Sequence, residues 1–282
     1  MSSFVLPPSS PPAPSSPESL AVASVYAQLT DSEKTSLSSN AGMVSRHVRA
    51  MKLDVTKAVL SVRSTLAWRE SFGVPSDPAW KADAKRTEAF LSENAGGKMF
   101  VRGTDIDGRA ILHFRPRYET TFDLERNLIH LVYNLEKAIA VSKRSGHELF
   151  IVIIDYTGYG MRNMMPFSSQ KAIIGVLQSH FPERLKNCFL INPPYLFRGV
   201  WTLISPFLDP VTLEKIQFIT TDIERLREYV PAEHLPVSLG GSAPNLAEPF
   251  DCLRYYDMPL DEPVGVDADM PFGPDGVKGG NE

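Results

Sequence analysis

Hydrophobic and polar positions along the chain follow two different periods. Residues 124–146 place leucine and isoleucine every three or four positions, which predicts a long amphipathic helix. Two short runs, 149–155 and 188–192, are apolar on both faces, as strands in a helix-covered sheet are, and 215–220 predicts a further strand. A β-rich run at 110–114 follows an Asp-Gly turn and predicts another strand. Because the two patterns alternate, we expect an α/β fold with right-handed crossovers and a largely parallel sheet.

The N-terminal part has a different character. Residues 6–20 are mostly Pro and Ser and bury too little apolar area to offset their ordering entropy, so we expect a disordered arm over 1–30. Amphipathic stretches follow, one of them opened by the capping residue Asp54, and they predict a small helical lobe over 31–95. The sheet domain then covers 96–242. The extension 243–282 is rich in Pro, Gly and Asp, and it either wraps the surface or is loose.

One stretch of the chain is unusually apolar. Between Asn192 and Asp209 the only ionised side chain is Arg198. The stretch is too short, and too interrupted by Arg198 and Pro206, for a membrane-spanning helix. The pattern alone leaves two interpretations open, a buried core helix or a segment that touches a bilayer.

Composition excludes several functional classes. The 282 residues carry a net charge of −4, so nothing favours nucleic acid as a partner. Cys188 and Cys252 lie far apart, and the six histidines form no pair with metal-ligand spacing, so we expect neither a disulfide framework nor a metal site. The N-terminus lacks the pattern of a signal peptide, which favours the cytoplasm.

Motifs of the common α/β enzymes are also missing. The sequence contains no nucleophile elbow and no phosphate-binding loop, and the glycine-rich stretch at 158–163 lacks a third glycine. Asp155 ends a strand at the edge where such folds bind ligands, so it is either a base or a turn acceptor, the second being the ordinary role. We therefore expect a protein that is not an enzyme and needs no cofactor.

Four segments in order carry a resemblance to a known family. They are "RHVRAMKLDVTKAV…LAWRESFG" at 46–73, "DGRAILHFRP" at 107–116, "FPERLKNCFLIN" at 181–192 and "PFLDPVTLEKI" at 206–216. Over about residues 40–242 the chain resembles the CRAL-TRIO lipid-transfer family, in particular its fungal phosphatidylinositol-transfer branch. The resemblance implies a helical N-terminal lobe and a mostly parallel sheet whose helices enclose an apolar lipid cavity closed by a gate helix.

On this resemblance the apolar stretch is the gate. Burial of one methylene contributes about 0.8 kcal/mol, so a lipid with roughly thirty chain carbons would lose on the order of 20 kcal/mol in water. Exchange must then happen at a membrane, through a segment that is stable facing either protein or lipid. The expected gate and cavity residues are Tyr195, Leu196, Phe197, Val200, Trp201, Leu203, Ile204, Phe207 and Leu208.

The resemblance also implies a site for the lipid headgroup. Its residues match Lys52, Glu183, Thr212 and Lys215, where a carboxylate would accept from inositol hydroxyls while threonine and lysine would hold the phosphodiester. Met51 stands where the family motif has arginine, which would lower headgroup affinity. The alternative for Glu183 and Lys215 is a structural ion pair on the surface.

The expected cargo is phosphatidylinositol, exchanged for a second lipid that stays open between phosphatidylcholine and a sterol. The expected partners are phospholipid and, transiently, the surface of organelle membranes, and the protein is expected to be a monomer. Two alternatives remain. One is a regulator that presents phosphatidylinositol to a lipid kinase, and the other is a carrier of a sterol or another apolar ligand.

Overall fold

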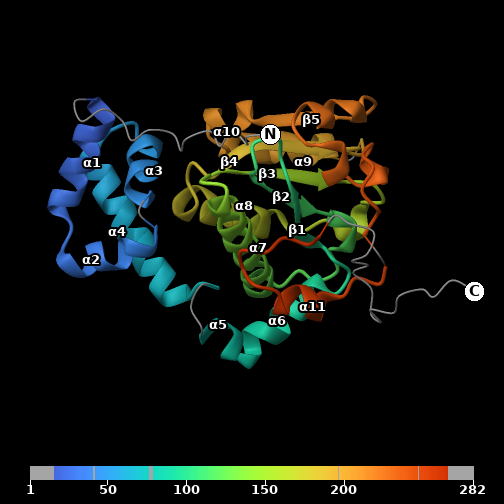
Figure 1. Cartoon of the computed structure of the whole chain (residues 1–282), viewed down its shortest axis with the longest axis horizontal. Helices are drawn as coiled ribbons and strands as arrows, with labels where there is room; N and C mark the ends of the chain where they lie inside the picture. The colour runs from blue at the N-terminus through green and yellow to red at the C-terminus, as the bar shows by residue number, and fades with distance from the viewer. Residues whose placement is uncertain (1–15, 41, 76–78, 196, 247, 266–282) are drawn as a thin grey trace, which may run out of the picture. The chain divides into compact units, whose positions relative to one another are not determined.

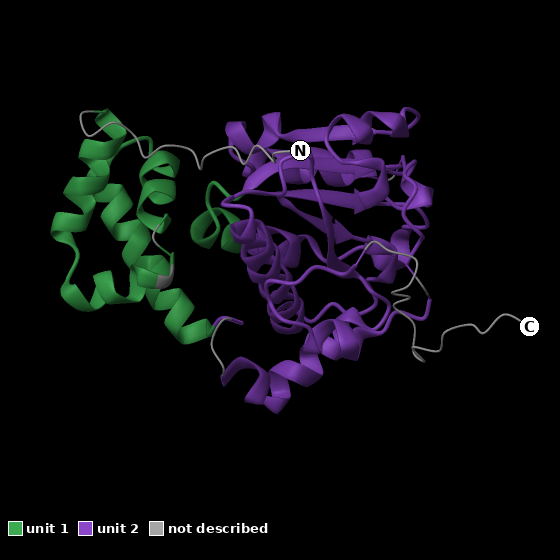
Figure 2. Cartoon of the chain, viewed as in Figure 1, with its two compact units in different colours: residues 1–73, 175–184 green, residues 74–174, 185–282 purple. Residues whose placement is uncertain are grey.

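The computed structural model describes residues 16–40, 42–75, 79–195, 197–246 and 248–265. The chain forms two compact units (Figure 2). Unit 1 comprises residues 1–73 and 175–184, and unit 2 comprises residues 74–174 and 185–282.

Unit 1 is helical and has its own core. Its helices are α1 (Pro17–Gln28), α2 (Asp31–Leu37), α3 (Met43–Ala50) and α4 (Val55–Phe72), with a short 3-10 turn η1 (Ser38–Asn40). Side-chain caps start three of them, at Ser16, Thr30 and Asp54. Val25, Val44 and Val62 are fully buried where these helices meet. The helical lobe therefore holds together by ordinary packing of valine-rich faces.

The disordered arm expected over 1–30 is wrong for residues 17–28, which form α1. Ser16 accepts a hydrogen bond from Ser19 N, and Pro17 stands at the first helical turn, where a missing N–H has no cost. Ala21 and Val25 bury one side of the helix, and Glu18 pairs with Arg49 at 2.7 Å. Residues 1–15 lie outside the described part of the chain.

Unit 2 contains a five-stranded sheet of order β1-β2-β3-β4-β5 (Figure 1). β1 is antiparallel to β2, and the remaining neighbours are parallel, so the expected α/β fold is confirmed. The strands are β1 (Met99–Thr104), β2 (Ala110–Phe114), β3 (Phe150–Asp155), β4 (Leu185–Ile191) and β5 (Ile216–Ile219). The helices are α5 (Ala79–Ala82), α6 (Ala84–Asn94), α7 (Leu124–Arg144), α8 (Phe167–His180, ending in unit 1), α9 (Phe197–Ile204), α10 (Pro210–Glu214) and α11 (Cys252–Asp257).

The two faces of the sheet are covered differently. Ile151 and Ile153 of β3 are each only 1% exposed and pack with Leu235 and Leu239. These leucines belong to a chain segment of three 3-10 helices, η5 (Ile223–Glu228), η6 (Ala232–His234) and η7 (Val237–Leu239). Side chains alternate along a strand, so Val152 and Ile154 point the other way, and that face carries α9. We call the first face the sealed face and the second the α9 face.

The C-terminal extension packs on unit 2 as far as residue 265. Tyr255 of α11 is fully buried, and its hydroxyl accepts from Val101 N at 2.9 Å and donates to Asn134 Oδ1 at 2.7 Å. Val264 N donates to Val101 O at 2.9 Å. Of the two alternatives for this segment, its described residues wrap the sheet domain.

Candidate lipid-binding site

The apolar stretch forms α9 and a 3-10 turn, η4 (Ser205–Phe207). Phe197 at the start of α9 is 7% exposed and packs on Cys188 and Leu190 of β4. Its ring also lies 4.7 Å from that of Tyr156, and Trp201 makes an edge contact with Phe218 at 5.1 Å. One side of α9 therefore rests on the sheet.

The other side of the same stretch faces water. Tyr195, Leu203 and Phe207 are 83%, 59% and 38% exposed. Val200, Trp201, Ile204 and Leu208 are half-buried. Leu196 lies outside the described residues. The described residues of the predicted gate thus contact both the sheet and the solvent. Each interpretation of the sequence, a core helix or a surface segment, is therefore correct for one side of this stretch. Their role as a gate stays a prediction.

The α9 face of the sheet is incompletely covered. Val152 and Ile154 of the central strand are only half-buried, although strands in a helix-covered parallel sheet are normally buried on both faces. Leu185 and Ile216 at the starts of their strands are also half-buried. Apolar side chains of β3, β4, β5 and α9 are therefore only partly buried on this face, which suits contact with an apolar ligand.

The side chains packed beneath α9 form an uncharged cluster. This cluster contains only aliphatic and aromatic side chains and one thiol. Burial raises the pKa of Cys188 to about 12 and raises the pKa of Tyr156 even further, so both groups keep their protons at neutral pH. A hydrocarbon that binds here would therefore not desolvate any charged side chain of this cluster.

The four predicted headgroup residues are divided between the two units. In unit 1, Lys52 is exposed just after α3, and Glu183 is half-buried in the loop between α8 and β4. Both have left-handed backbone conformations, with φ of 52° and 54°. Residues other than glycine rarely adopt these angles, and where they do the position is often functional.

In unit 2 the other two residues flank a short helix. Thr212 lies in α10, and its hydroxyl donates to the capping carboxylate of Asp209. Lys215 caps the C-terminus of α10, and its carbonyl accepts from Cys188 N at 2.9 Å. The hydroxyl of Thr212 would have to release Asp209 to donate to a phosphate. Membership of all four residues in a headgroup site stays a prediction.

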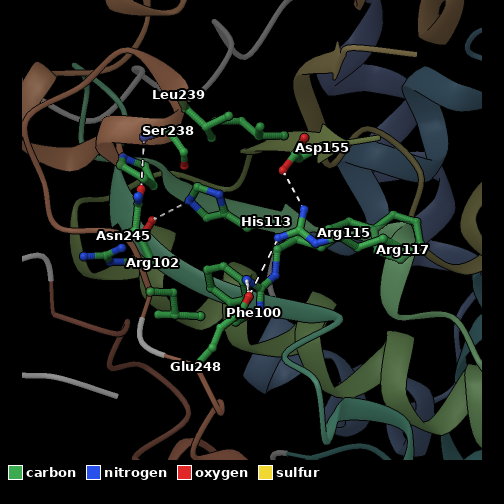
Figure 3. A pocket seen from close by; sticks show the side chains of 14 residues that line it. Phe100, Arg102, His113, Arg115, Arg117, Asp155, Ser238, Leu239, Asn245 and Glu248 are labelled. Carbon is green, nitrogen blue, oxygen red and sulfur yellow. Dashed lines mark hydrogen bonds and ion pairs between the residues drawn. The ribbon is translucent and has the colours of Figure 1, made fainter. Parts of the chain in front are cut away.

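A cavity lies on the sealed face. It has a volume of about 290 Å³, and its walls include Arg115, Arg117 and Asp155 at the carboxyl ends of β2 and β3 (Figure 3). Asp155 accepts from Thr157 N at 3.0 Å and from Arg117 Nη1 at 3.0 Å, so it is the turn acceptor that the sequence favoured. Sequence reasoning missed this pocket because strand ends and residues 236–248 build it together. The cationic run after β2 was the available signal.

Two kinds of feature are absent from the described residues. No cluster of His, Cys, Asp or Glu among them could hold a metal ion. Their helices are each too short or too polar to cross a bilayer.

Comparisons with known proteins agree with this architecture. The profile of the CRAL/TRIO domain matches residues 94–241. A CRAL-TRIO domain-containing protein of Schizosaccharomyces pombe, C23B6.04c, is 35% identical over 198 residues, which cover 70% of this chain and 18% of that protein. The phosphatidylinositol transfer protein CSR1 of Eremothecium gossypii is 32% identical over 204 residues, which cover 70% of this chain and 46% of CSR1.

PDR17 of Saccharomyces cerevisiae, another phosphatidylinositol transfer protein, is 31% identical and covers 67% of this chain and 55% of its own. The chain thus spans from a fifth to about half of the length of these relatives. The crystal structure of Sfh5 superposes with a TM-score of 0.54 at 19% identity and covers 71% of this chain and 70% of its own, which supports the fold alone. The profile match spans more than half of the chain and the fold agrees, so this protein belongs to the CRAL/TRIO domain family.

Proposed function

We propose that this protein is a carrier, and not an enzyme, that takes up phosphatidylinositol at a membrane surface and exchanges it for a second lipid. The observation that carries the proposal is the half-covered α9 face, where Val152 and Ile154 of a central strand keep contact with water. The names of CSR1 and PDR17 support phosphatidylinositol as the cargo. Membership in the CRAL/TRIO family supports lipid as the class of ligand.

The physical argument concerns both ends of the lipid. Each methylene that leaves water contributes about 0.8 kcal/mol, so burial of acyl chains against the α9 face compensates for the free energy that their removal from the bilayer costs. The exposed side of α9, with Tyr195, Leu203 and Phe207, provides apolar contacts to a bilayer during exchange. Lys52, Glu183, Thr212 and Lys215 supply the charges and hydrogen bonds that an inositol phosphodiester needs.

The test measures transfer of fluorescent phosphatidylinositol between two populations of vesicles. Wild-type protein is expected to accelerate transfer over the spontaneous rate. The double variant Lys52→Ala, Lys215→Ala should lose most of this acceleration while its circular dichroism and melting temperature stay near the wild-type values. Lys57→Ala with Lys186→Ala is the matched control, because it removes two other exposed ammonium groups.

A well-folded wild type that transfers no phosphatidylinositol contradicts the proposal. Mass spectrometry of lipid that co-purifies with the protein identifies the second cargo and separates phosphatidylcholine from a sterol. If phosphatidylinositol transfer fails while a sterol co-purifies, the protein is a carrier of another ligand. Loss of a bound kinase on deletion of residues 1–15, which leaves α1 and its cap in place, with transfer intact, would add the adaptor role.

A further inference from the structure

The pocket on the sealed face has no part in the proposed lipid site. Its lining includes Ile153 and Leu239, which pack in the sealed-face cluster, whereas α9 packs on the opposite side through Phe197. Phe100 of β1 and His113 of β2 both line the pocket, and their rings are stacked in parallel with centroids 5.0 Å apart (Figure 3). The volume of about 290 Å³ lies at the small end of ligand pockets, which hold roughly 300–1,000 Å³.

Cations outnumber anions in the lining. Arg117 and Asp155 form a close pair at 3.0 Å and neutralise each other. Arg115 meets its carboxylate partner, Glu248, only at 3.4 Å, and the Glu248 side chain is 59% exposed. This leaves one arginine of the lining, Arg102, to be accounted for.

Arg102 is buried without an acidic partner among the described residues. The residue is 3% exposed, and its Nε donates to Gly265 O at 3.2 Å. Its Nη1 has no hydrogen-bond partner within the described part of the chain. A buried guanidinium without a counter-charge is costly. The residues of the lining therefore carry about one positive charge that their own carboxylates do not balance.

The neighbouring histidine does not add to this charge. Burial, together with the positive charges of Arg102 and Arg115, lowers the pKa of His113 to about 3. His113 is thus neutral at physiological pH and contributes a ring surface to the wall. The same two arginines that hold His113 neutral would attract an anion.

We propose that this pocket binds a small monocarboxylate with a compact, flat apolar body. One unbalanced positive charge matches one carboxylate, and Nη1 of Arg102, which has no partner among the described residues, is a charged donor for it. The rings of Phe100 and His113, with Ile153 and Leu239, match an aromatic or short branched body. The proposal is independent of lipid transfer, because none of these residues lies on the α9 face.

The test uses benzoate as the probe, measured by titration calorimetry on the full chain. We expect saturable binding with a Kd on the order of 1 mM or tighter, as suits a ligand of this size. Benzamide has the same shape without the charge and should bind at least about tenfold more weakly. Inorganic phosphate lacks the apolar body and should also bind more weakly than benzoate.

Two pairs of variants place the site. Ser238 is exposed at the pocket, so Ser238→Asp adds a negative charge there and should weaken benzoate binding about tenfold. Ser242→Asp makes the same charge change at an exposed residue outside the lining and should leave binding unchanged. Glu248→Gln removes the carboxylate that competes for Arg115 and should tighten binding several-fold, whereas Glu228→Gln should not.

Phosphatidylinositol transfer should be the same in all four variants, which separates this site from the lipid site. Equal affinity for benzamide and benzoate would overturn the proposal, because the charge would then have no role. Equal effects of Ser238→Asp and Ser242→Asp would overturn it as well, because binding would then lie elsewhere.

Discussion

The imidazole of His180 lies parallel to the indole of Trp68, with ring centroids 4.3 Å apart and an interplanar angle of 8°. The buried hydroxyl of Thr65 donates to Ser179 O at 3.0 Å and lies 3.0 Å from His180 Nδ1. These contacts anchor the last turn of α8 in unit 1, although residues 167–174 of the same helix belong to unit 2. One continuous helix therefore serves both units.

The Trp68–His180 stack should be measurable as a coupling energy. In a double-mutant cycle with Trp68→Ala and His180→Ala, we expect about 0.5–1.5 kcal/mol of interaction in the free energy of unfolding, because stacked rings add to their area burial. Urea titrations provide the four values. A parallel cycle between Trp68 and His147, a half-buried residue of unit 2, should give no coupling. Strict additivity at the first pair would show that the stack contributes nothing.

His47 should make the stability of the protein depend on pH. Burial, with the charge of Arg46 as the next cause, lowers the pKa of this histidine from 6.5 to about 4 in the folded state. Above pH 6.5 both states are neutral, and the contribution of His47 is fully present. As the pH falls from 6.5 to about 4, the unfolded chain takes up a proton that the folded chain refuses, so stability decreases.

Between pH 7 and pH 5 this effect should cost about 2 kcal/mol. His47→Asn keeps a group that can hydrogen-bond Ser61, whose hydroxyl lies 2.8 Å from His47 Nδ1, but it does not titrate. The variant should therefore lose about 2 kcal/mol less than the wild type over this interval, measured by urea unfolding at each pH. Parallel losses in both proteins would rule out His47 as the source.

Lys98 should be indispensable to the fold of unit 2. It is 1% exposed, and its ammonium contacts Glu93 at 2.5 Å, Glu119 at 3.1 Å and Asn127 at 2.8 Å. Burial raises the pKa of Glu119, so this carboxylate depends on Lys98 for its charge. Lys98→Met would leave two buried carboxylates without a cation and should cost about 3–5 kcal/mol.

Glu119→Gln is the comparison for that variant. It keeps one carboxylate for Lys98 and removes the mutual repulsion with Glu93, so its cost should be clearly smaller. Thermal unfolding at neutral pH ranks the two variants. An equal or larger loss in Glu119→Gln would show that the cluster is not organised around the lysine.

The exposed side of α9 should determine membrane association. Leu203 is 59% exposed, so Leu203→Asp should leave the fold intact while placing a charge where contact with hydrocarbon is proposed. Sedimentation with phospholipid vesicles should show at least about tenfold weaker binding. Leu60→Asp on α4 is the matched control, because Leu60 is 61% exposed and the change is identical. If both variants bind vesicles as the wild type does, α9 is not the contact.

Periodicity predicted the central architecture well. The leucine repeat that predicted a helix over 124–146 is α7, and the run at 110–114 is β2. A strand with apolar side chains on both faces leaves a continuous apolar run in the sequence, and 149–155 shows it as β3, although one of its faces is only partly covered. These elements are defined by their own residues, so a local pattern is enough to find them.

Elements that depend on distant partners were harder to predict. α1 was hidden in a Pro/Ser-rich stretch because its stability comes from Val25 packing in the core of unit 1 and from a single cap at Ser16. The pocket on the sealed face is lined by residues of β1, β2 and β3 and by residues from the 236–248 segment, and a local sequence pattern does not predict contacts between segments so far apart. Of the candidate lipid site, the sequence predicted the apolar stretch but not the partial solvent exposure of Val152 on the central strand.

The two faces of β3 differ in how completely the protein covers them, and this difference gives the two sides of the sheet different roles. Ile151 and Ile153 are buried by the side chains of the protein itself, so packing on this side of the sheet needs no ligand. Val152 and Ile154 keep part of their apolar surface in contact with water, so on the proposed function an acyl chain that covers them would be bound by the hydrophobic effect. On the proposed function the ligand-free protein should therefore be rare, and release of one lipid should coincide with uptake of the next.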